Sequence, residues 1–305
     1  MILITGGNGF IGRGLAKTLT ARGIPFRLAC RSEVRGGVAV GDINGSTSWK
    51  TALDGISCVI HLAGLAHQTK HQPSIERYRQ VNVVGSLRLA EEAASAGVQR
   101  MVFVSSIGVL GQTTVPGERL SEASRPSPQT PYAKSKYEAE ITLDSFCRAS
   151  GLDLVIVRPP LVYGQDAKGN FGKLVRLVAS GYPLPLRSVC NRRSIISLSN
   201  LSSALSECAT NPAAANATFV VAEGQAVSTP EIINAIAAGL HRKPRLLPTP
   251  PSLLSFLINL TGRASIADGL LNSLEIDSSK FTRVLGWEPK GTTMDNIEKE
   301  LAKRF

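Results

Sequence analysis

The first half of the chain alternates short, almost continuously apolar runs with longer stretches in which apolar residues recur every three or four positions. The short runs predict buried β-strands, and the longer stretches predict amphipathic helices. Because such strands and helices alternate, the pattern predicts an α/β fold with a doubly wound parallel sheet that is covered on both faces. The expected strands span residues 1–5, 25–30, 37–42, 57–64, 100–106 and 152–159, and the expected helices span residues 11–22, 75–96 and 132–149.

The pattern changes beyond about residue 164. Pro and Gly become more frequent, the helical stretches shorten, and "RRSIIS" (192–197) and "TFVVAE" (218–223) look like small isolated strands. A chain of 305 residues has room for a second lobe. We therefore expect a first domain at residues 1–164 and a smaller α/β lobe made mainly of residues 165–305, with a soft boundary and with some C-terminal chain free to return to the first domain.

Positive charge is in excess, with 34 Lys and Arg against 23 Asp and Glu and a net charge of +11. Such an excess favours anionic partners, including phosphorylated small molecules and acidic membrane surfaces. The basic residues are dispersed and show no interleaving with aromatic residues, so a nucleic-acid partner is not expected. The apolar run at residues 250–262 is too short to span a bilayer, and we expect a core helix there, with peripheral membrane contact as the alternative.

The cysteines and histidines give no sign of a disulfide framework or a metal site. The five cysteines are scattered and odd in number, and none forms a CxxC pair. This usage is typical of a reducing cytoplasm, and the chain begins directly with an expected strand rather than a targeting peptide. His67 and His71 are not at metal-binding spacing on any expected helix. We therefore expect a cytoplasmic protein that binds no metal.

A glycine-rich stretch, "TGGNGFIG" (5–12), joins the first expected strand to the first helix. Glycines there allow a tight turn, close approach of the backbone to a pyrophosphate, and close packing of helix on strand. The helix N-terminus then offers free N–H groups to the anion. The sequence therefore predicts a Rossmann-type dinucleotide site, with cofactor contacts from Gly6, Gly9, Phe10, Ile11 and Gly12.

The end of the second expected strand bears on the choice of dinucleotide. An NAD site usually has a carboxylate there for the ribose hydroxyls. This strand ends in "LACRS", with Arg31 and no carboxylate, and an arginine suits a 2′-phosphate. The sequence thus favours NADP(H) over NAD(H), although Arg31 could also be a simple surface residue. We expect Asp42 near the adenine amino group and Ile43 against the adenine ring.

"PYAKSKYEAE" (131–140) places Tyr132 four residues before Lys136. On a helix this spacing puts a phenol and an ammonium on one face, one turn apart. Taken alone, the pair fits a solvated helix surface better than a catalytic site. The other motifs of the chain change that balance.

Those motifs resemble the extended short-chain dehydrogenases/reductases, in the branch of nucleotide-sugar epimerases, dehydratases and reductases. The resemblance covers nearly the whole chain. It rests on "TGGNGFIG" together with "HLAG" (61–64), "VNVVGS" (81–86), "VSSIGVLG" (104–111), "YAKSK" (132–136), "RPPLVYG" (158–164) and "LGWEPK" (285–290), which occur in the family's order.

The resemblance implies that Tyr132, Lys136 and Ser106 are catalytic. Tyr132 would move the proton of a sugar hydroxyl, Ser106 would hold the reacting oxygen, and Lys136 would hold the nicotinamide ribose. A free phenol has a pKa of about 10, and we expect Lys136 and an oxidised nicotinamide to lower it. Further cofactor contacts are implied for Leu62, Ala63, Gly64, Asn82, Ser105 and Pro159.

The second lobe should hold the substrate, which the resemblance implies is a UDP-sugar. Arg193 matches the family's arginine for the substrate diphosphate, and Arg192 is the alternative one residue away. Asn170 would either cap a helix or contact the substrate. The resemblance also implies a possible homodimer built from the helices that hold Asn82 and Tyr132.

The reaction is narrowed by what the motifs lack. Leu161 stands where many epimerases and dehydratases have an asparagine, and "SSIG" lacks the adjacent acids of the dehydratases. A 4-ketoreductase consumes reduced cofactor, so Arg31 favours reduction of a UDP-4-keto-6-deoxy-N-acetylhexosamine, as in bacterial surface-polysaccharide (O-antigen) synthesis. The alternative is a UDP-hexose or UDP-N-acetylhexosamine 4-epimerase. A non-catalytic NADP-sensing module is a minor alternative, because Tyr132 and Lys136 are both present.

Overall fold

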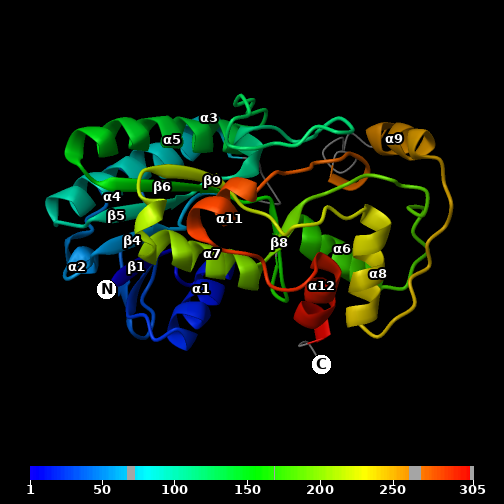
Figure 1. The fold of residues 1–305 in the computed structure, drawn as a ribbon, viewed down its shortest axis with the longest axis horizontal. Helices are drawn as coiled ribbons and strands as arrows, with labels where there is room; N and C mark the ends of the chain where they lie inside the picture. Colours follow the sequence, from blue (N-terminus) through cyan, green and yellow to red (C-terminus); the bar gives the residue numbers. More distant parts are fainter. Residues whose placement is uncertain (67–72, 168, 261–268, 303–305) are drawn as a thin grey trace.

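The computed structural model describes residues 1–66, 73–167, 169–260 and 269–302, with the backbone alone for 256–260. Within these residues the main sheet has seven strands in the order β3-β2-β1-β4-β5-β6-β9 (Figure 1). All neighbouring pairs are parallel. The doubly wound fold predicted from the sequence is confirmed. The strands are β1 (Ile2–Thr5), β2 (Phe26–Cys30), β3 (Gly37–Ala39), β4 (Cys58–His61), β5 (Arg100–Val104), β6 (Asp153–Arg158) and β9 (Ala217–Val220).

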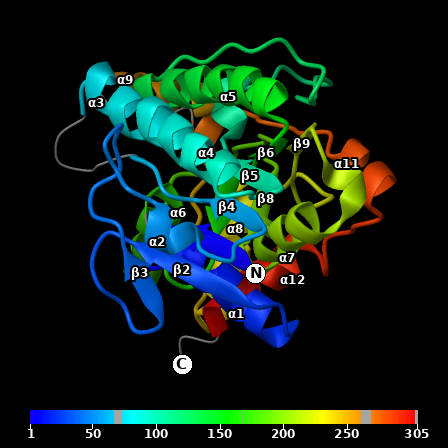
Figure 2. The ribbon, with the colours of Figure 1, turned by 90° about the vertical axis from the view of Figure 1, so that its left-hand side faces the viewer.

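Helices cover both faces of this sheet (Figure 2). Successive residues of a strand point to opposite faces, so Ile2 and Ile4 of β1 join one hydrophobic cluster and Leu3 joins the other. The first cluster lies under α1 (Phe10–Ala21), α7 (Leu198–Thr210) and α11 (Ser279–Leu285). The second lies under α2 (Lys50–Leu53), α4 (Gly85–Ser95) and α5 (Pro131–Ser150). Alternating burial thus explains why every central strand is apolar throughout.

The helix expected at residues 75–96 forms in three pieces. α3 (Ile75–Arg79) leads into a π-helical turn, η1 (Gln80–Val84), and α4 follows. Asn82 lies in the π turn and is 1% exposed. A π turn inserts an extra residue into a helix and is frequent at functional sites. No local sequence signal marks such a turn, so the sequence predicted one continuous helix.

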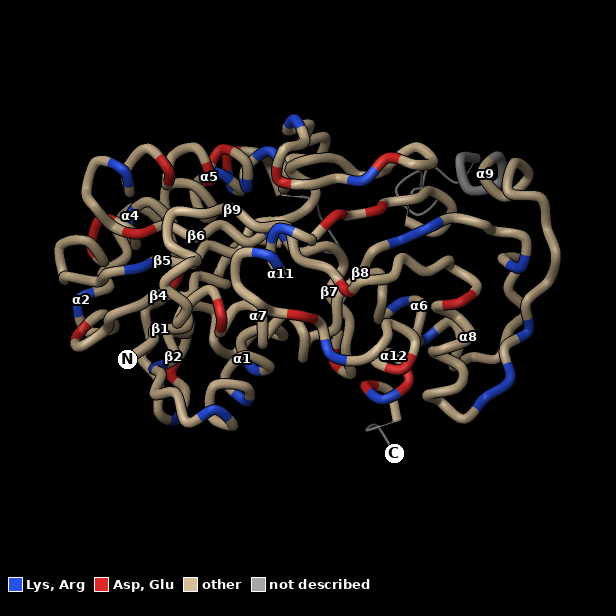
Figure 3. The backbone as a smooth tube through the Cα atoms, in the orientation of Figure 1, with Lys and Arg blue, Asp and Glu red and all other residues tan. Residues whose placement is uncertain are grey.

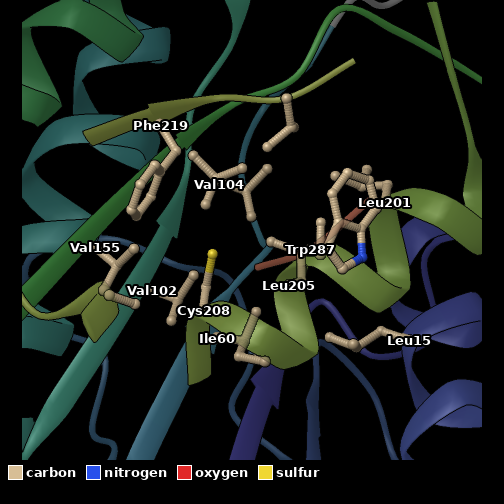
Figure 4. Close-up of a cluster of buried hydrophobic side chains, with 14 of the residues drawn as sticks. Leu15, Ile60, Val102, Val104, Val155, Leu201, Leu205, Cys208, Phe219 and Trp287 are labelled. Carbon is tan, nitrogen blue, oxygen red and sulfur yellow. The ribbon is translucent and has the colours of Figure 1, made fainter. Parts of the chain in front are cut away.

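The prediction of an isolated strand at residues 218–223 was wrong. β9 pairs with β6 and extends the main sheet. α7 returns with it: Leu201, Leu205 and Cys208 of this helix lie in one buried cluster with Val102 and Val104 of β5 (Figure 4). Strand pairing between distant segments has no local signature, which is why apolar residues alone could not place β9.

The second lobe lies at the opposite end of the molecule from α2 (Figure 1). It contains a two-stranded parallel sheet of β7 (Leu161–Tyr163) and β8 (Ile195–Ser197), so "RRSIIS" contributes a strand that is not isolated. A separate hydrophobic cluster fills this lobe. Its helices are α6 (Asn170–Ala179), α8 (Thr229–Gly239), α9 (Pro251–Leu260) and α12 (Thr293–Ala302).

A buried carboxylate joins the two lobes. Glu223, which follows β9, is 2% exposed and accepts the Tyr163 hydroxyl at 2.6 Å and an Asn200 side-chain N–H at 2.5 Å. It also accepts the backbone N–H of Ser197 at 3.1 Å and an Asn296 side-chain N–H at 3.1 Å. Burial and this carboxylate raise the pKa of Tyr163, so its phenol stays protonated as a donor. Elements of both lobes are therefore held at one point.

The apolar run at residues 250–262 forms α9 up to Leu260. Leu254 is buried in the core of the second lobe, whereas Leu253 is 48% exposed. The expected core helix thus also presents an apolar side chain to solvent. Among the described residues, no helix has both the length and the apolar character needed to cross a bilayer.

Candidate active site

The glycine-rich loop has the backbone that close approach to a phosphate requires. Gly6 has φ = 68°, and a Cβ on Gly12 would lie 2.4 Å from the Gly6 carbonyl oxygen. Gly9 is the N-cap of α1 and has no side chain to satisfy the first N–H groups of the helix. The N-terminus of α1 is therefore left to bind an anion. These residues fit a dinucleotide pyrophosphate as predicted.

The segment after β4 lies directly against this loop. Thr5 accepts the backbone N–H of Ala63 at 3.2 Å, and a Cβ on Gly6 would lie 3.0 Å from the same nitrogen. A Cβ on Gly64 would lie 3.0 Å from Asn82 Oδ1 and 3.5 Å from Lys136 Nζ. Gly6, Gly64 and Asn82, which are predicted to contact the cofactor, thus lie close to the predicted catalytic residue Lys136. They meet at the carboxyl edge of the sheet, where ligands of such folds bind.

Asn82 holds this edge together through three hydrogen bonds. Its Oδ1 accepts the Leu65 backbone N–H at 2.7 Å, and its Nδ2 donates to the Leu65 carbonyl at 3.1 Å and to Ser135 Oγ at 2.9 Å. The π turn places Asn82 between the loop after β4 and α5. Its side chain is thereby occupied in fixing the two segments that carry Gly64 and Lys136.

The two serines after β5 have different surroundings. Ser105 is 3% exposed, and its hydroxyl is one of three buried side-chain polar atoms without a hydrogen-bond partner among the described residues. A bound cofactor would give that hydroxyl a partner. Ser106 caps a short 3₁₀ helix, η2 (Ile107–Val109), by accepting the Gly108 N–H at 3.1 Å. A Cβ on Gly108 would meet both Ser106 Oγ, at 3.3 Å, and Ala133 Cβ, at 3.6 Å.

α5 carries the predicted catalytic pair. Thr130 caps the helix, Pro131 opens it, and Gly151 ends it in the left-handed conformation. Tyr132 is half-buried, with its ring 6.2 Å from that of Tyr78 in an edge-on arrangement. Because a Cβ on Gly108 would lie 3.6 Å from Ala133 Cβ, the Ser106 loop adjoins the helical turn that bears Tyr132.

Lys136 is 4% exposed and donates to the Val104 carbonyl at 2.8 Å, with its Nζ 4.5 Å from the centre of the Phe103 ring. Burial lowers the pKa of this ammonium to about 8, and Glu140 opposes the shift. The ammonium is thus held beneath the site, where the cation–π contact and the carbonyl both favour its charge.

The expectation that Lys136 lowers the pKa of Tyr132 is wrong for these residues alone. Burial, with a smaller contribution from Tyr78, raises the pKa of Tyr132 to about 12. The surroundings remove water from the phenol, and desolvation disfavours the charged form. A phenolate therefore needs further positive charge, which an oxidised nicotinamide carries.

A buried histidine supports the edge from below. His61 Nδ1 lies 2.7 Å from Thr5 Oγ1, and its Nε2 lies 2.9 Å from Ser86 Oγ. Burial lowers the pKa of His61 to about 3, and Lys136 contributes to the shift. The imidazole is therefore neutral and ties β1, β4 and α4 together. His67 and His71 lie outside the described residues, and no metal-ligand cluster occurs among the residues that are described.

Arg31 and Asp42, which were predicted to contact the cofactor separately, form an ion pair. Arg31 Nε lies 3.2 Å from Asp42 Oδ1, and both side chains are largely exposed, at 80% and 66%. Ile43 is partly buried against α4, where a Cβ on Gly85 would lie 2.5 Å from its Cγ2. The predicted adenine end of the site thus presents a basic and an acidic group side by side.

Residues predicted from the remaining motifs lie at the junction of the lobes. The Pro159 carbonyl accepts the Ile107 N–H at 2.9 Å, which joins the end of β6 to the Ser106 loop. Phe10 packs toward the second lobe, and Ile11 and Leu62 pack against the cluster under α1. These contacts are structural, and their cofactor contacts stay predictions.

Arg193 and Arg192 separate in the structure. Arg192 pairs with Glu275 at 3.3 Å, whereas Arg193 donates to the Asn272 carbonyl at 2.7 Å. Both belong to a segment that hydrogen-bonds to residues 273–276. Residues 273–276 in turn hydrogen-bond to the loop between η2 and α5. The ion pair occupies Arg192. The alternative that Asn170 caps a helix was wrong, since Gly169 is the N-cap and Asn170 is the first residue of α6.

Comparison with known proteins decides the family. A model described as the NAD dependent epimerase/dehydratase family matches residues 2–222. The chain belongs to this family. A Vibrio cholerae protein named UDP-glucose 4-epimerase is 36% identical over 315 residues, which cover 100% of this chain and 95% of that protein. The chain is therefore an enzyme of the epimerase/dehydratase family, and the resemblance seen in its motifs is confirmed.

Solved structures share the whole fold. The structure of MoeE5 in complex with UDP-glucose and NAD has 25% sequence identity and a TM-score of 0.80, and covers 99% of this chain and 98% of that one. UDP-N-acetylglucosamine 4-epimerase from Bacillus cereus matches with a TM-score of 0.82 at 20% identity, over 98% and 97% of the two chains. The second likeness concerns the fold alone.

The hydrogen bonds and ion pairs of several residues around the site of this epimerase/dehydratase enzyme were missed by sequence reasoning, although Thr5 and His61 stand in motifs that it used. Thr5 and His61 stand inside apolar strands, and a polar residue in such a run is a signal for a buried hydrogen bond. Glu140 stands one turn after Lys136 on the same helix face, and Arg158 ends an apolar strand. A buried charge needs a partner, so these two could have been paired from the sequence.

Proposed function

We propose that this enzyme acts at C4 of a UDP-linked sugar and interconverts the C4 epimers of a UDP-hexose or UDP-N-acetylhexosamine. The observation that carries the proposal is the full-length similarity to a protein named UDP-glucose 4-epimerase, at 36% identity, in a chain that retains Ser106, Tyr132 and Lys136. The sequence alone favoured a 4-ketoreductase. The relative moves the balance to the epimerase that was then the alternative.

The chain's own residues would manage the proton and the position of the sugar. Tyr132 takes the proton of the C4 hydroxyl as that carbon is oxidised, and returns it when the ketone is reduced. Ser106 donates to the C4 oxygen, and Lys136 holds the cofactor ribose. The dinucleotide, when bound, supplies the acceptor and the donor of the hydride. Arg193 supports binding of the diphosphate, because its guanidinium matches two phosphate oxygens.

The position of Asn170 adds to the proposal. Asn170 opens α6 beside the junction and is exposed, which suits contact with the sugar or uridine.

A homodimer through α4 and α5 is supported by Ile141 of α5, an apolar side chain that is 54% exposed. The five cysteines are all free thiols, which suits a reducing compartment such as the cytoplasm.

A second function is favoured by Arg31. The end of β2 has no carboxylate to accept from the ribose hydroxyls of NAD, and an arginine stands there instead. This supports NADP(H) and therefore a 4-ketoreductase of a UDP-4-keto-6-deoxy-N-acetylhexosamine, which consumes NADPH in each turnover. The pairing of Arg31 with Asp42 weakens that support, since a carboxylate then lies close to the place of the 2′-phosphate.

One experiment separates the two functions. Purified protein with NAD is incubated with UDP-glucose or UDP-N-acetylglucosamine, and the epimers are separated by anion-exchange chromatography. We expect an equilibrium mixture of C4 epimers without net change in the absorbance of reduced nicotinamide. Stoichiometric loss of NADPH with a UDP-4-keto-6-deoxy-N-acetylhexosamine, and no epimerisation, would instead establish the ketoreductase.

The role of Arg31 is tested by Arg31→Ala. If Arg31 binds a 2′-phosphate, the variant loses about 10- to 100-fold in affinity for NADP and keeps its affinity for NAD, because a charge-assisted hydrogen bond is lost. Affinities are measured by calorimetry, with the exposed neighbour Arg35→Ala as a matched control. Equal affinity for NADP in the variant and the unchanged enzyme would show that Arg31 is only a partner of Asp42.

A further inference from the structure

The outer end of the second lobe carries a surface that is both basic and apolar. Two segments lie side by side there, residues 179–187 and 242–247. The Leu184 N–H donates to the Arg245 carbonyl at 2.7 Å, and the Leu247 N–H donates to the Leu184 carbonyl at 2.8 Å. Arg242 adds a side-chain bond to the Ala179 carbonyl at 2.5 Å. The two segments therefore form one continuous, fixed strip.

Alternation along the strip sorts its side chains. Leu184 and Leu246 face each other across a parallel bridge and pack into the core of the lobe. Their neighbours face outward: Leu247 is 49% exposed, and Arg245 is exposed as well. Tyr182, at the other end of its segment, is 71% exposed. Apolar, aromatic and cationic side chains are thus all exposed to solvent along the same two segments.

The charge of this region has a single sign. Residues 169–192 and 238–260 contain no Asp or Glu, and Figure 3 shows only basic positions along the chain between α8 and α9. Arg192 pairs with Glu275. None of the other Lys and Arg side chains in residues 169–192 and 238–260 forms an ion pair with any described residue. These cations are Lys173, Arg176, Arg187, Arg242, Lys243 and Arg245.

We propose that this strip docks the enzyme on an anionic membrane surface. Arginine and lysine bind lipid phosphates, while tyrosine and leucine enter the boundary between headgroups and acyl chains. Leu253, exposed at the start of α9, extends the apolar part. A groove or aromatic platform for nucleic acid would need stacked rings, and Tyr182 is the one exposed aromatic residue in the two described segments.

Docking through this strip leaves the catalytic residues free. Ser106, Tyr132 and Lys136 lie on the first domain, at the carboxyl edge of the main sheet, whereas the strip lies at the far end of the second lobe. The inference is therefore independent of the reaction proposed above. It concerns where the enzyme works, and it does not depend on which sugar nucleotide the enzyme converts.

Co-sedimentation with vesicles tests the proposal. The full chain is mixed with vesicles of phosphatidylcholine alone or of phosphatidylcholine and phosphatidylglycerol in equal parts. We expect binding to the anionic vesicles alone, and at least a tenfold weaker partition at high salt, because the charge attraction is screened. Absence of binding to anionic vesicles at low salt would overturn the proposal.

Two variants locate the surface. Arg187→Glu/Lys243→Glu/Arg245→Glu reverses exposed charges of the strip, and we expect its partition to fall by about a hundredfold or more. Tyr182→Ser/Leu247→Ser removes the apolar contact, and we expect a loss of about tenfold that persists at high salt. Both variants should keep their dinucleotide affinity, which shows that they are folded.

The control carries the same change in net charge elsewhere. Lys17→Glu/Lys50→Glu/Arg283→Glu alters exposed residues of α1, α2 and α11, which cover the main sheet, and we expect it to bind vesicles within about threefold of the unchanged enzyme. An equal loss in the control and the strip variant would mean that only net charge matters, and would overturn the proposal. Single-stranded RNA that binds more tightly than vesicles, with the same dependence on the strip, would assign the surface to nucleic acid instead.

Discussion

Replacing Tyr132 with phenylalanine is expected to lower kcat by about 10²- to 10⁴-fold, the range lost when a positioned proton-transfer group is removed. The change deletes one oxygen and leaves the ring, so packing against Tyr78 at 6.2 Å is retained. The loss falls on kcat rather than on binding, because the hydroxyl proton moves only in the chemical step. Turnover is measured from the epimer ratio, and dinucleotide affinity is measured by calorimetry.

Tyr137→Phe is the matched control. Tyr137 lies on the same helix, one residue after Lys136, and loses the same atom on substitution. We expect its kcat to stay within about twofold of that of the unchanged enzyme, since Tyr137 is partly buried away from the predicted reacting atoms and loses only its hydroxyl. A Tyr132→Phe enzyme that keeps a third or more of its kcat would show that another group moves the proton.

The strands and the cofactor loop could be predicted because their signals are local. Residues 2–5 and 101–104 are buried on both faces and read as apolar runs, and the glycines of residues 5–12 have a spacing that the backbone itself demands. The structure places β1 and β5 inside the predicted spans 1–5 and 100–106. Where sequence and structure agree, one segment carries the whole signal.

The parts that failed depend on contacts between distant segments. β9 joins β6 across 62 residues at Val155 and Ala217, and nothing within residues 218–223 indicates that pairing. The π turn at Asn82 depends on its bonds to Leu65 and Ser135, which come from other elements. Burial among several elements raises the pKa of Tyr132 when no cofactor is bound, and the spacing of Tyr132 and Lys136 in the sequence does not reveal that burial.

Removing Glu140 is expected to destabilise the fold by about 3–5 kcal/mol, the cost of leaving a buried charge without its partner. Arg158 donates to Glu140 from Nε at 3.0 Å and from a terminal nitrogen at 2.6 Å, with side chains 9% and 4% exposed. Glu140→Ala leaves the guanidinium of β6 buried against α5. Denaturant unfolding should show the full loss.

An exposed pair on the same helix is the control. Arg148 and Asp144 lie 2.9 Å apart but are 75% and 49% exposed, so Asp144→Ala should cost under about 1 kcal/mol. The double variant Glu140→Met/Arg158→Met removes both charges and should recover most of the stability. The single variants Glu140→Met and Arg158→Met are measured beside it. If the double variant loses as much stability as these two single variants together, then packing rather than charge accounts for the loss.

The same carboxylate should also set the alkaline limit of activity. Glu140 raises the pKa of Lys136, against the burial that lowers it to about 8. Glu140→Gln removes that support, so the pKa falls further and the ammonium is lost at a lower pH. If protonated Lys136 is needed to hold the ribose, the alkaline limb of the pH–rate profile moves to lower pH. A limb that stays in place, in a variant whose stability has fallen, would confine Glu140 to holding α5 on β6.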